Sequence, residues 1–129
     1  MSGGADYNVG MAYIDGFLIP VPKKKLAEYK AISRKAGKVW KEHGALEYRE
    51  NVGDDLEHQG LASFVKAAGA KKGEVVVFSW IVFKSRAHRD KVNKKVMADA
   101  RIAAMCTPGS APFDVKRMAY GGFAGLVEV

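Results

Sequence analysis

The chain has 129 residues, a formal net charge of +7, 48% hydrophobic residues and 27% charged residues. This length is enough for one domain with a substantial core and too short for two, and the composition is that of ordinary soluble globular proteins. The lone cysteine, Cys106, excludes an internal disulfide and a multi-cysteine metal site. No apolar run approaches the roughly 20 residues that a membrane-spanning helix needs.

Residues 1–10 contain serine and several glycines, and we expect them to form a flexible N-terminal tail. The remaining residues, 11–129, are expected to form a single domain. The first six residues have neither the basic region nor the apolar region of a secretory signal peptide. We therefore expect a cytoplasmic protein.

The first half of the chain predicts a strand, a helix and a second strand. Residues 11–19 are rich in strand formers, and Pro20 and Pro22 predict the end of this strand because proline cannot donate to a ladder. From residue 24 apolar side chains recur every three or four positions, which predicts a helix ending at Gly44. Residues 45–52 alternate weakly and are polar, as expected of an edge strand.

A short helical excursion is predicted over residues 61–68, and the strand 74–83 that follows it is apolar on both faces. Alternate side chains of a strand point to opposite sides of the sheet. One face carries Val75, Val77, Ile81 and Phe83, and the other carries Val76, Phe78, Trp80 and Val82. Each large side chain left in water would forfeit roughly 1.5–3 kcal/mol. Both faces of this strand therefore require a cover.

The last third of the chain predicts a helix, a loop and a final strand. Ser85 is the predicted N-cap of a helix whose apolar stripe ends near Arg101. The turn residues of 106–112 predict a loop. The final strand, over residues 118–127, contains three glycines, which predict a bulge or the close approach of another backbone.

The element order strand, helix, strand, strand, helix, strand predicts an α+β ferredoxin-like βαββαβ sandwich. Right-handed crossovers place both long helices on one side of the sheet, with the first and third strands central. The other face then has no intramolecular cover and would exceed the apolar patch that monomers normally expose. We therefore expect a homodimer in which two sheets pack face to face.

Four sequence blocks resemble the DUF1428 family of small bacterial proteins, over about residues 11–126. The blocks are Tyr13–Phe17 with Pro20–Pro22, Lys41–Leu46, Val76–Ile81 with Arg89–Asp90 and Met97–Asp99, and Pro112–Asp114 with Lys116–Met118 and Tyr120–Phe123. The resemblance implies the dimeric α/β-barrel superfamily, which also contains small cofactor-independent monooxygenases and muconolactone isomerases. It implies no established activity for the family itself.

Asp15 is the principal candidate for a catalytic residue. It lies in the middle of the first strand, on one face with Tyr13 and Phe17, and an unpaired buried carboxylate costs several kcal/mol. Arg89 or Arg117 could supply a cation. Asp15 could act as a general base or an orienting carboxylate in a cavity between sheet and helices; the alternative is a structural salt bridge or a hydrogen bond to Tyr or Trp.

His43 is the second catalytic candidate, as a proton shuttle, although a histidine at a helix end is often only a partner of the helix dipole. Trp80 could stack on a ligand, or it could be a core or interface side chain. The candidate ligand-binding residues are Tyr13, Trp80, Arg89 and Arg117. Charged residues from Arg89 to Arg117 could form an anion-binding rim or an ion-pair network.

No metal or cofactor is expected. His43, His58 and His88 have no metal-ligand spacing, and the GxGxxG, Walker and GxSxG motifs are absent. One hypothesis is a dimeric-barrel protein that binds or transforms a small molecule in an apolar pocket by cofactor-independent proton transfer. The alternatives are an RNA or polyanion binding module that uses basic helical faces, with weak and non-specific binding at most, and a non-catalytic structural dimer. No contact with a membrane is expected.

Overall fold

The computed structural model describes residues 11–129, and the predicted N-terminal tail, residues 1–10, lies outside the described residues. The elements are β1 (Tyr13–Pro22), η1 (Lys23–Lys25), α2 (Leu26–Glu42), β2 (Glu47–Val52), α3 (Phe64–Ala68), β3 (Glu74–Phe83), α4 (Arg86–Met97), α5 (Ala100–Met105), η2 (Val115–Arg117) and β4 (Ala119–Ala124). Within residues 11–129 no helix is both long enough and apolar enough to cross a membrane.

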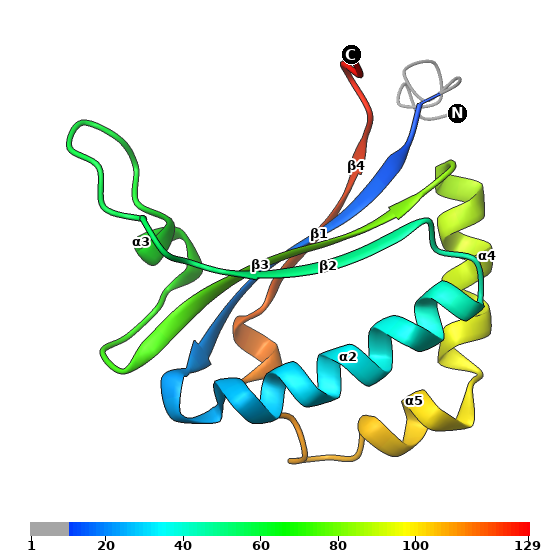
Figure 1. The fold of residues 1–129 in the computed structure, drawn as a ribbon, viewed down its shortest axis with the longest axis horizontal. Coiled ribbons are helices and arrows are strands. Elements are labelled where there is room, and N and C mark those ends of the chain that lie inside the picture. The colour runs from blue at the N-terminus through cyan, green and yellow to red at the C-terminus, as the bar shows by residue number, and fades with distance from the viewer. Residues whose placement is uncertain (1–10) are drawn as a thin grey trace.

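The four strands form one antiparallel sheet in the order β2-β3-β1-β4. The first and third strands are therefore central, as predicted, and β2 is an edge strand. Figure 1 shows the sheet nearly edge-on, with α2, α4 and α5 on the same side of it. The predicted α+β class is confirmed.

Strand β1 continues through both of its prolines, so the predicted end at Pro20 is wrong. Pro20 and Pro22 stand opposite Val76 and Glu74 of β3. The next residue, Lys23, donates its backbone N–H to Gly73 on the β3 side. Since amides alternate along a strand, the two prolines face the other side, where the pairing with β4 has already ended at Leu18. No ladder bond is lost at either proline.

The predicted helix over residues 86–101 is in fact two helices, α4 and α5. Ser85 is the N-cap of α4, as predicted, and its hydroxyl accepts from the His88 N–H. Asp99 then begins α5, because its carboxylate accepts from the Arg101 N–H at 2.9 Å. A side chain that caps a new helix competes with continuation of the preceding one. The apolar period alone does not reveal this break.

Strand β4 pairs with β1 in a continuous register from Tyr13–Ala124 to Leu18–Ala119, so the predicted bulge is wrong. The close approach of another backbone, the other predicted reason for these glycines, is found at Gly125, where an added Cβ would lie 2.9 Å from the Ala12 carbonyl oxygen. Gly122 accommodates an aromatic ring instead. A Cβ on Gly122 would lie about 2.9 Å from two ring carbons of Tyr13. The ring of Phe123 lies over Gly16 in the same way on the other face.

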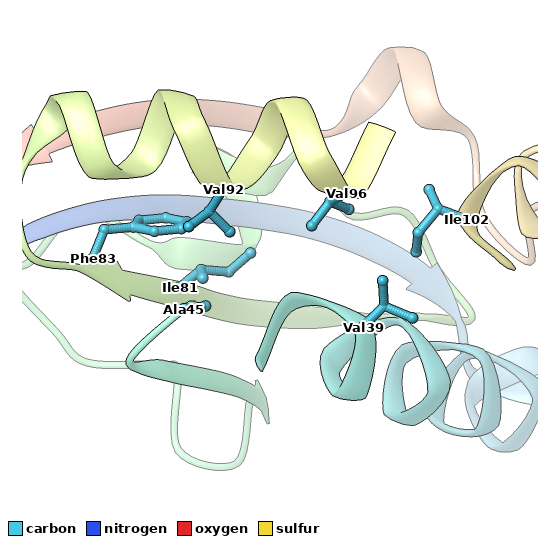
Figure 2. Close-up of a cluster of buried hydrophobic side chains, with 7 residues drawn as sticks. All are labelled: Val39, Ala45, Ile81, Phe83, Val92, Val96 and Ile102. Atoms are coloured by element: carbon cyan, nitrogen blue, oxygen red, sulfur yellow. The ribbon is translucent and has the colours of Figure 1, made fainter. Parts of the chain in front are cut away.

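The core lies between the sheet and the helices. Its larger cluster consists of Val39, Ala45, Ile81, Phe83, Val92, Val96 and Ile102, which come from α2, the connection between α2 and β2, β3, α4 and α5 and point toward one another (Figure 2). A second cluster, Ile19, Val21, Tyr29 and Val77, joins β1 and β3 to α2. Both clusters use only one face of β3.

The other face of β3 is only partly covered. Phe64 of α3 packs against Phe78 with ring centroids 6.1 Å apart, and Val76 is buried. One short helix, α3, thus covers part of this second face. The sequence had predicted no intramolecular cover there. Phe78 remains 46% exposed and Phe123 of β4 61% exposed. We call the apolar surface made by Phe64, Phe78, Trp80 and Phe123 the outer sheet face.

Candidate functional site

A cavity of about 720 Å³ lies between the sheet, helix α2 and the segment that follows α5. Its lining is mostly apolar and includes Phe17, Ile32, Ala36, Ile81, Ile102 and Met118. Residues 106–113 form part of its wall. A volume of this size, with a few polar groups in an apolar wall, is typical of a site for a small molecule.

Asp15 lies on this cavity, in the middle of β1, and is 1% exposed. Its carboxylate accepts a hydrogen bond from Arg89 Nη1 at 2.6 Å. Tyr120 and Asn93 lie near the carboxylate and help to lower its pKa. Arg89 also donates to the Tyr120 hydroxyl at 2.7 Å. Strands β1 and β4 and helix α4 therefore meet at one polar cluster in an otherwise apolar wall.

Burial raises the pKa of the Asp15 carboxyl above its usual value of 3.8, while the charge and hydrogen bond of Arg89 and the polar side chains of Tyr120 and Asn93 oppose the rise. Burial likewise raises the pKa of Tyr120, and the negative charge of Asp15 adds to this effect. A carboxyl whose pKa is moved toward neutrality is a better proton donor and acceptor near neutral pH than an ordinary aspartate.

Asn93 is oriented by Trp40. The indole Nε1 of Trp40 donates to Asn93 Oδ1 at 3.0 Å, so the amide NH₂ of Asn93 is left to donate toward Asp15. Trp40 also lines the cavity. Asn93 was not predicted as a site residue from the sequence, although it stands four residues after Arg89 and so lies on the same face of α4. That spacing was the available signal.

Tyr13 supports Arg89 from outside the cavity. The guanidinium of Arg89 lies 5.1 Å from the centre of the Tyr13 ring, within the range of a cation–π contact. The ring in turn occupies the space that a side chain at position 122 would need. Gly122 therefore permits Tyr13 to hold Arg89 against Asp15.

A second polar cluster lies at the α2 and β2 side of the cavity, and the sequence analysis did not predict it. Glu50 Oε1 accepts from the Tyr29 hydroxyl at 2.7 Å. Glu50 Oε2 accepts from Tyr48 at 3.1 Å and from the Ser33 hydroxyl. Burial and the charge of Glu50 raise the pKa of both tyrosines. Residue 50 looked like a solvated position of an edge strand, so no pattern indicated it.

The side chains of the other three predicted site residues lie away from Asp15. His43 Nε2 bonds Asp99 Oδ2 at 2.8 Å at the end of α2. Arg117 binds both carboxylate oxygens of Glu74 at 2.7 Å. Trp80 pairs with Gly16, next to Asp15, and belongs to the cavity wall, but its side chain points to the outer sheet face and donates to Glu47 Oε1 at 2.8 Å. Of the six predicted site residues, the structure brings together Asp15, Tyr13 and Arg89.

The charged residues between positions 89 and 117 form separate ion pairs. Arg101 binds Asp99 and Glu42, and together with His43 these residues join the end of α2 to the start of α5. The Arg101 hydrogen bonds hold the pKa of Asp99 well below its usual range. Among residues 11–129 no three His, Cys, Asp or Glu side chains gather closely enough to hold a metal ion.

Comparison with known proteins identifies the family to which the chain belongs. Residues 12–115 match a family model described as "Protein of unknown function (DUF1428)". The chain belongs to the DUF1428 family. It is 40% identical over 118 residues to the uncharacterized protein YbaA of Escherichia coli K12, covering 92% of this chain and 99% of that relative, and equally similar to YbaA of Shigella flexneri. Asp15, Glu50, Arg89 and Asn93 lie within the residues that the DUF1428 model matches.

Proposed function

We propose that this protein binds a small, largely apolar molecule in the cavity and that Asp15 transfers a proton to or from it without a bound cofactor. The observation that carries the proposal is the position of Asp15, a 1% exposed carboxylate with a raised pKa at the wall of a cavity of about 720 Å³. Residues with such shifts in a concave apolar site are disproportionately functional.

The surrounding residues suit this role. Arg89 is bound to Asp15 Oδ1, so the other oxygen, Oδ2, is the proposed proton acceptor. Arg89 stabilises the carboxylate before transfer, and Asn93, fixed by Trp40, adds to this stabilisation by lowering the pKa of Asp15. Asp15 would take a proton from the ligand at Oδ2 and return it at another position, as in an isomerisation.

We also propose that the fold is ferredoxin-like and that two copies pack through the outer sheet face into a dimeric α/β barrel. Phe64, Phe78 and Phe123 are 49%, 46% and 61% exposed in the single chain. Burying such side chains in a second copy removes them from water, and each large apolar side chain contributes roughly 1.5–3 kcal/mol when fully buried.

The two tryptophans provide a test of ligand binding. Both tryptophans belong to the cavity wall, but the Trp80 indole points to the outer sheet face, where it bonds Glu47. Trp80→Phe leaves Trp40 as the single fluorophore, and Trp40→Phe leaves Trp80. A bound apolar fragment should change the Trp40 emission and leave the Trp80 emission unaltered. Fragments that bind without this contrast would place binding outside the cavity.

Proton transfer is tested by incubating bound carbon acids in D₂O and following loss of their proton signals by NMR. Wild type should catalyse the exchange and Asp15→Asn should reduce it by 100-fold or more, since general acid–base catalysis contributes roughly 10²–10⁴-fold. Asp54→Asn, in the exposed turn after β2, is the matched control. If carbon acids bind but their protons do not exchange, the protein binds small molecules without catalysing proton transfer, which contradicts the catalytic part of the proposal.

One observation favours polyanion binding as a second candidate function. Lys30, Arg34, Lys38 and Lys41 of α2 line a groove of about 780 Å³ beside β2. Titration with single-stranded RNA should give weak binding that falls steeply with salt, as counterion release requires. Tight, salt-resistant binding that discriminates between sequences would make RNA recognition the principal function.

A further inference from the structure

The carboxylate of Glu50 accepts its hydrogen bonds from neutral hydroxyl groups. Tyr29, Ser33 and Tyr48 all direct hydroxyl groups at its carboxylate. Among residues 11–129 none of the salt bridges includes Glu50. A carboxylate offers about four acceptor positions, and the three hydroxyls leave one of them open. Glu50 therefore has a charge without a salt-bridge partner among these residues and a remaining acceptor position.

Within the part of the chain that the structure describes, no cation points into the cavity on which Glu50 lies. The charged residues that line it are Asp15, Arg49 and Glu50. The Arg49 side chain bonds Glu47 on the outer sheet face, because residues 47 and 49 alternate with residues 48 and 50 along β2. Asp15 is already neutralised by Arg89. The charge that the cavity presents to a ligand is therefore that of Glu50.

The basic residues of α2 lie on the other side of this cluster. Glu50 also lines the groove that contains Lys30, Arg34, Lys38 and Lys41, and there a cationic ligand would meet repulsion. In the cavity, the same carboxylate is surrounded by apolar walls, where an ion pair is screened less than in water. A ligand cation is thus favoured on the cavity side.

We propose that Glu50 is a binding subsite for a cationic nitrogen, and that the cavity ligand is an apolar amine, an alkylammonium or arylalkylammonium compound. This inference rests on the proposed function, because it requires the cavity to bind small molecules. The ammonium group donates to the open acceptor position of Glu50, and the apolar body occupies the remainder of the cavity. Tyr29, Ser33 and Tyr48 fix the carboxylate in its orientation.

Three probes of equal length test the proposal: hexylammonium, 1-hexanol and hexanoate. Their binding is measured by Trp40 fluorescence in the Trp80→Phe background. Hexylammonium should bind at least about 10-fold more tightly than 1-hexanol, equivalent to about 1.4 kcal/mol, and hexanoate should bind most weakly. Glu50→Gln should abolish the preference for the ammonium without reducing the affinity for 1-hexanol.

Glu47→Gln is the matched control, since it removes the same charge from the same strand on the outer sheet face. It should leave the ammonium preference intact. Equal affinity for the ammonium and the alcohol in wild type, or an equal loss in both variants, would overturn the subsite and leave cavity binding standing. If none of the probes alters Trp40 emission, cavity binding fails and the subsite fails with it.

If Glu50→Gln does not fold, Tyr48→Phe provides a second test of the role of the Glu50 charge. This variant removes one of the three hydroxyl donors and leaves the carboxylate charge in place. The ammonium preference should then persist, because Tyr29 and Ser33 still orient the carboxylate and its charge is unaltered. A loss of preference in Tyr48→Phe would show that the hydroxyls, rather than the charge of Glu50, determine the affinity and would overturn the proposal.

Discussion

Arg89 of helix α4 donates a 2.6 Å hydrogen bond to Asp15 at the centre of strand β1. The two side chains are 12% and 2% exposed, so solvent screens their attraction only weakly. Asp90 and Tyr120 bind the same guanidinium, and Tyr13 lies beside it. The pair fixes α4 against the sheet and places a carboxylate at the cavity wall, which links the fold to the proposed chemistry.

The pH dependence of Asp15→Asn tests the raised pKa of Asp15. A carboxyl whose pKa is raised in the folded protein contributes stability below its unfolded pKa, near 3.8, and loses that contribution as pH rises through the folded value. Asparagine does not titrate. The melting temperature of Asp15→Asn relative to wild type should therefore increase as pH rises from about 3.5 to 7. A relative decrease would mean that Arg89 lowers the pKa of Asp15, and would argue for a structural anion.

Glu74 should show the opposite dependence. Hydrogen bonds from Arg117 lower its pKa from 4.5 to about 2, so its contribution to stability is present above pH 4.5 and is lost as pH falls toward 2. Glu74→Gln should melt at a lower temperature than wild type at pH 7, and the two curves should converge near pH 2. Asp54→Asn, in an exposed turn, serves as the control. If the difference in melting temperature between Glu74→Gln and wild type stays constant across this pH range, the charge of Glu74 is not the cause of the difference.

The general architecture could be predicted from the sequence because each element has a local signal. The two-sided apolar pattern of β3, the glycine after α2 and the serine before α4 depend only on neighbouring residues. The errors occur where the end of a strand or helix depends on a residue or strand distant in the sequence. Pro20 is tolerated because the pairing of β1 with β4 ends at Leu18, and the break before α5 depends on Asp99 acting as an N-cap.

The site was predicted in part for the same reason. A carboxylate in a central strand requires a partner, so Asp15 could be identified, but Arg89 lies 74 positions away. The choice between Arg89 and Arg117 depends on which face of α4 meets the sheet. Glu50 was missed because a glutamate in a polar edge strand resembles a solvated residue. Its hydroxyl partners come from α2 and from its own strand, and only the folded chain brings them together.

Gly122→Ala tests the support of Arg89 by Tyr13. A Cβ at this position would lie about 2.9 Å from two ring carbons of Tyr13 and even closer to its hydroxyl. Tyr13 must then move, and overpacking of this kind costs typically 1–3 kcal/mol. At Gly121 the nearest atom to an added Cβ is 3.6 Å away, an ordinary contact, so Gly121→Ala is the matched control.

Urea unfolding should therefore show a loss of about 1–3 kcal/mol for Gly122→Ala and a change within about 0.5 kcal/mol for Gly121→Ala. Proton exchange of a bound carbon acid should also slow in Gly122→Ala, because Arg89 loses its support. Equal stability of the two variants would show that the Tyr13 ring adjusts freely and does not hold Arg89.

The exposed aromatic side chains of the outer sheet face predict that the protein is a dimer. Light scattering at micromolar concentration should give twice the chain mass of 14.0 kDa for the wild type. Phe123→Asp should weaken the association by about 100-fold or more, roughly 2.7 kcal/mol, because a charge would be buried without a partner in the interface. Phe123 is 61% exposed in the single chain, so the monomer should keep its fold, as circular dichroism can verify. Met97→Asp, on the helix side and also 61% exposed, is the control and should remain dimeric. A monomeric wild type, or equal dissociation of both variants, would exclude the outer sheet face as the dimer interface.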